Sequence, residues 1–255
     1  MRLVDGADAI RGDLPSSATV TVEVPPEAGS SLGTDVHRLS SVQHVRDEVL
    51  AALRHTAGVP ILIGGDCSAD LGGIIHAASR ADVAVVWIDA HPDLNTPETS
   101  PSGAFHGMVL RTLLGDGPGE VVPATPIRAD RVILAGARAE DEAESDYIES
   151  AGLRVLRPSE LTPESLATAL RETGAASVYL HIDLDVLDPA EFECVGFPEP
   201  FGISVADLIG LISAARATLP LAGAAITEFS PASVDSATSD LPTILRIVGA
   251  LTKQL

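Results

Sequence analysis

The stretch VAVVWIDAHPDLN, residues 83–95, joins an apolar run of six residues to a cluster of acidic and imidazole side chains. An apolar run without alternation is typical of a strand that is covered on both faces, as in a parallel sheet. Asp89, His91 and Asp93 follow at intervals of two, so an extended backbone would direct them to the same side. Ligand sites of parallel α/β sheets lie beyond the carboxyl ends of the strands, and we therefore expect the chemistry of this protein here.

Similar apolar runs alternate with amphipathic segments along most of the 255 residues. We expect strands at 19–24, 59–64, 83–88, 131–136, 177–183 and 223–229, with a shorter one at 153–156. Helices are expected after the capping signals Thr162-Pro163, Ser204 with Asp207, and Asp240. Loops are expected at 25–33, 95–103 and 231–239. The alternation predicts an α/β fold with a parallel sheet between helices, in a single domain spanning residues 1–255.

Composition narrows the class of protein and its surroundings. A net charge of −20 and an isoelectric point near 4.5 argue against nucleic-acid or anionic-membrane partners. Two cysteines are too few for a disulfide framework and fit a reducing compartment. The first residues lack the apolar run of a signal peptide, and no stretch is long enough to span a membrane. We therefore expect a cytoplasmic protein.

Two further expected strands also end in acidic residues. Asp183 and Asp185 close the run YLHID, and Glu228 closes AAIT. One such aspartate can be an ordinary turn residue, and Asp188 before Pro189 fits that description. Several together repel one another unless a cation neutralises them. Carboxylates with one or two imidazoles suit Mn²⁺, and their number suggests two ions sharing bridging carboxylates.

Three segments together resemble signatures of the arginase (ureohydrolase) family, which comprises arginases, agmatinases and related amidinohydrolases. The family motifs GGDHS, DAHxD and SxDxDxxDP correspond here to GGDCS at 64–68, DAHPD at 89–93 and HIDLDVLDP at 181–189. The resemblance extends from about residue 61 to residue 231. It implies a three-layer α/β/α sandwich around a mainly parallel sheet of about eight strands. It also implies hydrolysis of a guanidino group by a hydroxide that bridges two Mn²⁺ ions.

The resemblance further implies the metal ligands. Asp89 and Asp183 would bridge the two ions, and Cys67 with Asp93 would complete one of the sites. The full ligand set would be Cys67, Asp89, His91, Asp93, Asp183 and Asp185.

Catalytic and substrate-binding roles follow from the same resemblance. Asp93 would relay a proton to the leaving amine, and Glu228 would face the guanidinium. His106, in SGAFHGM, would shuttle protons; the alternative is a loop histidine without a role. An α-amino acid would be held at its carboxylate and amino group by Asn95, Ser100, Ser102, Asp141 and Glu144.

Four positions depart from the family pattern. Cys67 stands in place of a histidine ligand, Ala104 in place of an asparagine and Phe197 in place of a small hydroxyl residue. His181 replaces a serine and should share a face with Asp183, either supporting the site or simply packing. Cys67 itself admits three interpretations, namely a nucleophile, an inert buried thiol, or a thiolate ligand that favours zinc, iron or cobalt over manganese.

These departures shape the predicted function. We expect a metal-dependent amidinohydrolase that converts Nω-hydroxy-L-arginine or L-arginine to (hydroxy)urea and ornithine, with L-arginine the poorer substrate. Alternatives are an agmatinase- or guanidinobutyrase-type ureohydrolase and a non-catalytic protein that binds a guanidino metabolite. The expected cofactors are two Mn²⁺, or another divalent transition metal at the Cys67 site. The only expected partners are a small-molecule substrate and further copies of the chain, as a trimer or hexamer.

Overall fold

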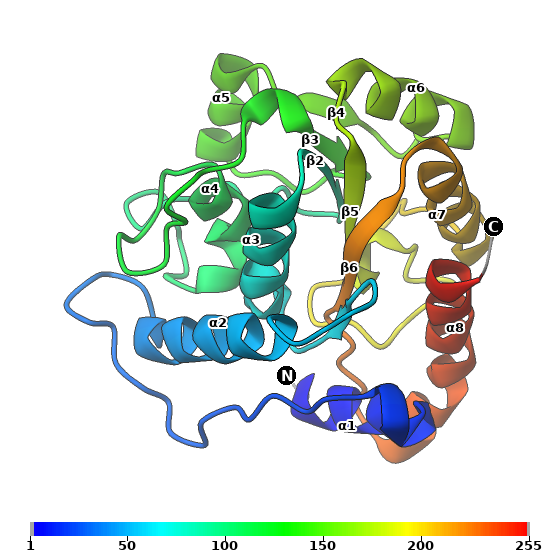
Figure 1. The fold of residues 1–255 in the computed structure, drawn as a ribbon, viewed down its shortest axis with the longest axis horizontal. Coiled ribbons are helices and arrows are strands. Elements are labelled where there is room, and N and C mark those ends of the chain that lie inside the picture. The colour runs from blue at the N-terminus through cyan, green and yellow to red at the C-terminus, as the bar shows by residue number, and fades with distance from the viewer. Residues whose placement is uncertain (1–2, 254–255) are drawn as a thin grey trace.

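A single six-stranded sheet, with every strand pair parallel, organises residues 3–253, the part of the chain that the computed structural model describes (Figure 1). The strand order is β1-β6-β5-β2-β3-β4. The strands are β1 (Ile61–Ile63), β2 (Val83–Ile88), β3 (Val132–Ala135), β4 (Arg154–Leu156), β5 (Ser177–Asp183) and β6 (Leu221–Thr227).

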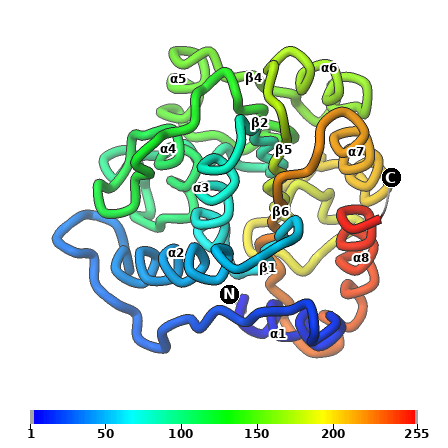
Figure 2. The backbone as a smooth tube through the Cα atoms, viewed as in Figure 1, coloured from blue at the N-terminus to red at the C-terminus, as the bar shows by residue number. Residues whose placement is uncertain are grey.

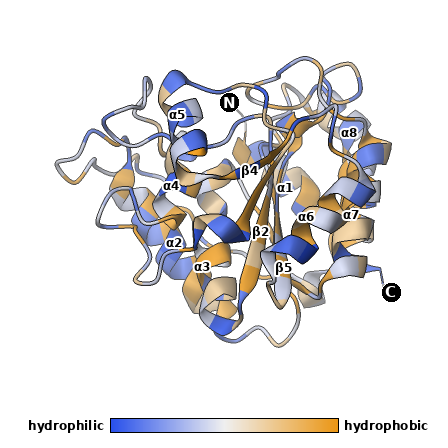
Figure 3. Cartoon of the chain, turned by 90° about the horizontal axis from the view of Figure 1, so that it is seen from above, coloured by the Kyte–Doolittle hydropathy of each residue, from blue (hydrophilic) through white to orange (hydrophobic). Residues whose placement is uncertain are grey.

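Helices cover both faces of the sheet, as the three-layer prediction requires (Figure 3). One face packs against α1 (Leu3–Asp13), α6 (Pro163–Thr173), α7 (Val205–Thr218) and α8 (Val234–Thr252). The other packs against α2 (Leu39–Leu53), α3 (Leu71–Arg80), α4 (Val109–Leu113) and α5 (Glu142–Ala151). Three short 3₁₀ turns, Cys67–Asp70, Phe105–Met108 and Leu184–Val186, follow strands or loops at the sheet edge.

The two central strands, β2 and β5, are buried along their whole length. Their even- and odd-numbered side chains enter different cores, because successive residues of a strand point to opposite faces. Val85 and Trp87 pack on the α2–α5 side, as does Tyr179 of the neighbouring β5. Odd-numbered residues at the ends of β2 and β5, such as Asp89 and Asp183, therefore follow side chains that face the α2–α5 layer.

The predicted elements hold for most of the chain. The strand at 177–183 has the predicted bounds, and helix α6 begins after Thr162, whose hydroxyl accepts a hydrogen bond from the Ser165 amide. Helix α7 begins after Ser204, which forms a reciprocal capping pair with Asp207.

Three expectations are wrong in detail. Residues 19–24 form no strand but part of the long connection between α1 and α2, with Val20 and Val24 exposed because nothing packs on them (Figure 2). Helix α8 begins at Val234, inside the predicted loop 231–239, because Ser233 caps it; the helix accommodates Pro242. The sheet has six strands in the described residues, fewer than the eight implied by resemblance.

Within residues 3–253, no helix combines the length and the apolar character needed to cross a lipid bilayer.

Valine-to-alanine substitutions at a buried and at an exposed position test which segments pack in the core. Val86→Ala, in the fully buried centre of β2, should lower the free energy of unfolding by about 2 kcal/mol, from two lost buried carbons plus the cavity they leave. Val20→Ala, in the exposed connection, should change it by less than about 0.5 kcal/mol. Urea unfolding curves measure both, and a comparable loss at Val20 would show that the 19–24 segment is packed after all.

Candidate metal centre

Four neighbouring strands place the predicted site residues at the carboxyl-terminal end of the sheet, which we call the site edge. Asp89 follows β2, Asp183 ends β5 and Glu228 follows β6, while the turn after β1 carries Cys67. Since β1, β6, β5 and β2 are adjacent in that order, side chains far apart in sequence meet there. The turns are tied together, as the Glu228 amide donates a 2.8 Å hydrogen bond to the Gly65 carbonyl.

Asp89, His91 and Asp185 form what we call the outer group, whose potential ligand atoms all lie within 4.8 Å of one another. The Nδ1 atom of His91 lies 3.0 Å from Asp185 Oδ2 and 3.5 Å from Asp89 Oδ1. Backbone amides orient both carboxylates, since His91 N donates to Asp89 and Ala90 N to Asp185. This geometry brings together three predicted ligands.

Cys67, Asp89, His181 and Asp183 form the inner group, also with ligand atoms within 4.8 Å, and all four are buried. The Cys67 thiol donates a 2.9 Å hydrogen bond to Asp183 Oδ2. Asp89 Oδ2 accepts from the Trp87 indole at 3.1 Å, and Thr227 donates to Asp183 at 3.2 Å. Asp89 belongs to both groups, as a bridging ligand would.

Asp93, the remaining predicted ligand, lies in neither group. It is buried in a left-handed backbone conformation (φ 51°), and its Oδ2 has no hydrogen-bond partner in the described structure. Burial, followed by the charge of Asp89, raises the pKa of its carboxyl well above the usual value. Strained backbone and unpartnered buried carboxylates are common at functional sites, and Asp93 therefore stays a predicted site residue.

The same edge holds other buried polar atoms without partners among the described residues, namely His181 Nε2 and both carboxylate oxygens of Glu228. Burial and then neighbouring carboxylates raise the pKa of Asp183 to about 7, of Asp185 to about 6 and of Glu228 to about 10. Ionising this set without a counter-charge is unfavourable. The donor atoms therefore fit divalent cations held by the outer and inner groups.

The environment of Cys67 separates its three interpretations. Burial and then the nearby carboxylates, Asp93 foremost, raise the pKa of its thiol well above the usual value, which suppresses a free thiolate nucleophile. The sulfur nevertheless lies among potential ligand atoms rather than among apolar side chains alone. A bound dication would deprotonate it, so the geometry favours the ligand over the inert thiol.

His106 lies next to the centre in the turn Phe105–Met108. Its ring stacks on Phe197 with centroids 5.1 Å apart, and Phe197 also meets the ring of His91 edge-on at 6.3 Å. Burial lowers the pKa of His106, so its imidazole is neutral near pH 7 and able to accept a proton. Phe197, one of the departures from the family pattern, is thus an aromatic cover beside the predicted shuttle.

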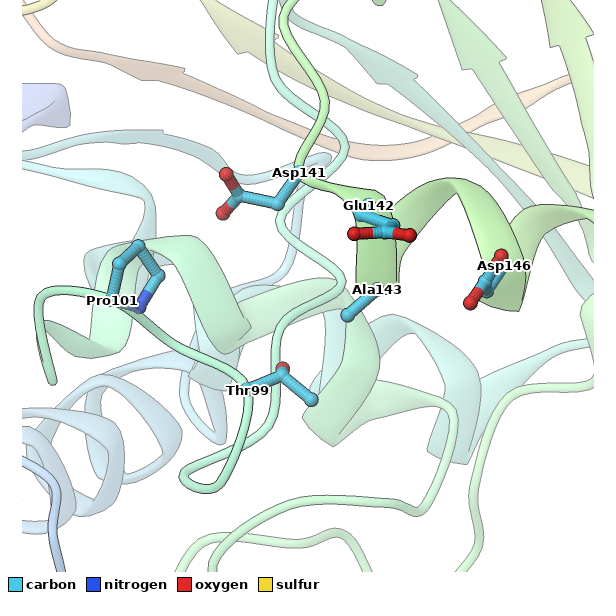
Figure 4. A pocket seen from close by; sticks show the side chains of 6 residues that line it. All are labelled: Thr99, Pro101, Asp141, Glu142, Ala143 and Asp146. Carbon is cyan, nitrogen blue, oxygen red and sulfur yellow. The ribbon is translucent and has the colours of Figure 1, made fainter.

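One predicted amino-acid-binding residue, Asp141, lines an open pocket of about 400 Å³ (Figure 4), whereas Asn95, Ser100, Ser102 and Glu144 are not among its lining residues. Thr99 and Pro101 of the 95–103 loop face the start of α5, where Asp141, Glu142 and Asp146 make the lining acidic. The side-chain amide of Asn95 donates a 2.9 Å hydrogen bond to Asp141 Oδ2.

Three other members of the predicted set, Glu144, Ser100 and Ser102, accept hydrogen bonds from the backbone. Glu144 accepts hydrogen bonds from the amides of Leu94 and Asp141, so its carboxylate braces the loop after β2 rather than facing solvent. The hydroxyls of Ser100 and Ser102 lie 3.5 Å apart and accept from the amides of Gly103 and Ala104. The loop is therefore ordered by its own polar residues.

Comparison with known proteins places this arrangement in context. The model of the family described as "Arginase family" matches residues 10–246. The chain belongs to the arginase family. It is 39% identical to the arginase of Bacillus subtilis over 155 residues, which cover 57% of this chain and 52% of the relative. It is 31% identical to an arginase of Staphylococcus aureus over 191 residues, which cover 71% of this chain and 63% of that relative. The aligned part thus spans between half and two thirds of these relatives.

Solved structures of the family share the fold. An Entamoeba histolytica arginase, solved in complex with L-ornithine, superposes with a TM-score of 0.88 at 25% identity, covering 100% of this chain and 94% of that one. A Bacillus subtilis arginase gives a TM-score of 0.82 at 30% identity with the same coverage. The three-layer architecture predicted from the sequence is therefore confirmed.

Two contributors to the centre escaped the sequence prediction. The sequence predicts only a supporting or packing role for His181, and it predicts no role for Asp70, which is buried against it. The available signal was position: His181 lies two residues before Asp183 on the same face of β5, and Asp70 ends the short turn that begins at Cys67.

The metal-free protein should lose stability between pH 6.5 and 8.5. Burial opposes the charged imidazole of His91, yet its hydrogen bonds to Asp185 and Asp89 raise its pKa to about 12, and the pKa of Asp183 is raised to about 7. Groups whose pKa is raised on folding stabilise the protein below their unfolded pKa, and this stability is lost as pH rises through the folded value. We expect a loss of about 2 kcal/mol in chelator-treated protein.

Thermal unfolding at the two pH values measures this loss. His91→Asn should flatten the dependence, because pH 6.5–8.5 lies between the unfolded and folded pKa values of His91. Added divalent metal should reverse it, because metal binding displaces protons and tightens as pH rises. Equal stability of the metal-free protein at both pH values would contradict the electrostatic description of the centre.

Proposed function

We propose that this chain hydrolyses the guanidino group of an α-amino acid, Nω-hydroxy-L-arginine or L-arginine, to (hydroxy)urea and ornithine. One observation carries the proposal: two groups of ligand atoms share Asp89 and lie beside Glu228, a buried carboxylate whose two oxygens have no partner among residues 3–253. Divalent ions held by these groups would lower the pKa of a water molecule so that it attacks at neutral pH.

Glu228 is suited to hold the guanidinium. A planar guanidinium donates two parallel hydrogen bonds to a carboxylate, and both oxygens of Glu228 are unused by the protein. Its left-handed backbone (φ 64°) directs the side chain from the end of β6, and the 2.8 Å bond to Gly65 fixes that turn. The raised pKa of Glu228 favours its protonated form in the metal-free site. Cations in the site would lower that pKa and favour the carboxylate that a guanidinium needs.

Proton movement falls to Asp93 and His106. The unpartnered Oδ2 of Asp93 can hold a proton and pass it to the leaving amine. His106, neutral near pH 7 and only half-buried, can exchange protons between the site and solvent. Phe197 restricts the approach of water by stacking on that imidazole.

The acidic pocket in Figure 4 supports an α-amino acid as the substrate class. Asp141 is exposed at its rim and would pair with an α-ammonium group, while Ser100 and Ser102 offer hydroxyls to an α-carboxylate. Asn95 links Asp141 to the loop that follows the metal ligands, so the two ends of a substrate would be held by one connected unit.

The thiol at position 67 supports the hydroxylated substrate. A thiolate ligand adds negative charge where an imidazole would be neutral, which weakens the pull of the ion on electrons of the substrate. Nω-Hydroxyarginine is a weaker base than arginine and reacts more readily with a nucleophile, so it tolerates a less electrophilic centre.

A panel of guanidino compounds tests the proposed function. We expect metal-loaded protein to release hydroxyurea from Nω-hydroxy-L-arginine with a kcat/KM about tenfold or more above that for L-arginine, and to act poorly on agmatine and 4-guanidinobutyrate. Glu228→Gln should lower kcat/KM by about 100-fold, since one charged hydrogen-bonding group contributes this much to a transition state. The control Glu164→Gln, exposed on α6, should leave it unchanged. No product from any compound would refute the proposal.

A substitution at Asp141 tests whether this residue binds the α-ammonium group of the substrate. Asp141→Asn should raise KM for the α-amino acid about tenfold, because a charge-assisted contact to the ammonium group becomes a neutral one. KM for 4-guanidinobutyrate, which has no amino group, should not change. Steady-state kinetics with both compounds measure this difference, and an equal rise in both would instead indicate a role for Asp141 in ordering the loop through Asn95.

A further inference from the structure

His181 occupies a position that packing alone does not explain. The side chain is fully buried, yet its Nε2 atom has no hydrogen-bond partner among the described residues. A ring nitrogen of His181 lies within 4.8 Å of Cys67 Sγ and of carboxylate oxygens of Asp89 and Asp183. A buried imidazole that only filled space would satisfy both nitrogens, because an unpartnered buried polar atom costs free energy.

Asp70 determines which nitrogen is free. Its Oδ2 lies 2.9 Å from His181 Nδ1, and its other oxygen accepts a hydrogen bond from the Tyr179 hydroxyl. An ionised Asp70 accepts a hydrogen bond from Nδ1–H, so the neutral imidazole carries its lone pair on Nε2. A carboxylate–histidine pair of this kind fixes the tautomer and orientation of histidines that bind metals.

The aromatic neighbour completes the positioning. Trp87 stacks face to face on the His181 ring, with centroids 3.6 Å apart and planes 9° from parallel, and the two residues pair in register between β2 and β5. The Trp87 indole also donates to Asp89 Oδ2. Trp87 therefore holds in place both the imidazole and a carboxylate of the inner group.

We propose that His181 binds the inner metal ion through Nε2, so that this ion has a Cys67–His181–Asp89–Asp183 ligand set and Asp70 is the positioning residue. The inference deepens the proposed function, on which it rests for the presence of a metal centre. It gives the departures at positions 67 and 181 one explanation, since an imidazole is absent from the turn after β1 and present on β5. On binding, Nε2 donates its lone pair, and the Cys67 thiol releases its proton to solvent.

The ligand set also predicts the metal. One thiolate, one imidazole and two carboxylates, all buried, suit a four-coordinate Zn²⁺, Co²⁺ or Fe²⁺. The outer group has only one imidazole and two carboxylates and is partly open to solvent through His91. The two sites should therefore differ in affinity, with the inner site binding Zn²⁺ or Co²⁺ more tightly than Mn²⁺.

Metal stoichiometry tests the inference without reference to activity. Full-length protein is stripped with a chelator, loaded with Zn²⁺ or Co²⁺, dialysed and analysed by mass spectrometry. Wild type and the control His55→Ser, on an exposed loop, should each retain two ions per chain. His181→Ser should retain one. The Cys67→His/His181→Ser double variant, which returns an imidazole to the turn, should recover the second.

Two further measurements guard against misfolding of His181→Ser. Asp70→Asn keeps a hydrogen-bond acceptor but removes the charge behind the imidazole, and should weaken the inner site 10- to 100-fold while leaving the outer site unchanged. In the Co²⁺-loaded wild type, a thiolate-to-cobalt absorption band should appear. Cys67→Ala should lose this band, and His181→Ser should lose or shift it.

The outcomes distinguish the two proposals. If His181→Ser folds and binds two ions as tightly as wild type, His181 is not a ligand, whatever the activity. If it loses one ion but no guanidino compound is hydrolysed by wild type, the ligand assignment stands and the proposed function fails. Turnover by chelator-treated wild type, together with alkylation of Cys67 that substrate prevents, would instead show a thiol–imidazole nucleophile and overturn the inference.

Discussion

The accumulation of buried negative charge at one edge of the sheet is the constraint on which the rest of this site depends. Asp89, Asp93, Asp183, Asp185 and Glu228 are each at most 2% exposed. Burial and then neighbouring carboxylates raise the pKa values of Asp93, Asp183, Asp185 and Glu228. Backbone amides and Thr227 satisfy some of their oxygens, and others have no partner in the described part of the chain. Such a cluster is stable only if protons or metal ions neutralise it.

Side chains of the protein partly compensate this negative charge through hydrogen bonds and ion pairs. His91 bridges two carboxylates of the outer group, while the Cys67 thiol donates to Asp183 in the inner one. Behind them, Asp70, Tyr179 and the stacked Trp87–His181 pair form a buried polar network inside an otherwise apolar core. That network reaches the inner group through the free Nε2 of His181 and through the Trp87 indole, which donates to Asp89. With the proposed ligand set, the departures at positions 67 and 181 would be coupled rather than independent.

The parts predicted well from the sequence are those governed by local pattern. The β2 and β5 strands follow from uninterrupted apolar runs, and the pairing of Asp89 with His91 follows from the two-residue spacing after β2. The same spacing wrongly predicts that Asp93 joins them, because the backbone at Asp93 is left-handed (φ 51°) rather than extended, and Asp185 completes the group instead. The unpaired segment 19–24 has the alternation of a strand, but strand formation needs a partner edge, which no local pattern supplies.

The early start of α8 has the opposite cause. Ser233 caps the first turn, and burial of Ala237, Ile244, Ile247 and Leu251 offsets the unfavourable Pro242. The serine-rich composition of 231–239 suggests a loop instead. The pairing of His181 with Asp70 joins residues 111 positions apart, so only the fold brings it to light.

The strand order also bears on when the centre forms during folding. The last strand to be synthesised, β6, lies between β1 and β5, and β5 itself lies between β6 and β2, so the edge that carries the ligands forms only when the sheet is nearly complete (Figure 1). Contacts of such long range form late in folding. No short segment of the nascent chain holds the inner group together, since Cys67 and Asp183 are 116 residues apart. Metal binding by the proposed inner group would therefore require the assembled sheet, and an ion held there would stabilise the completed strand order rather than initiate it.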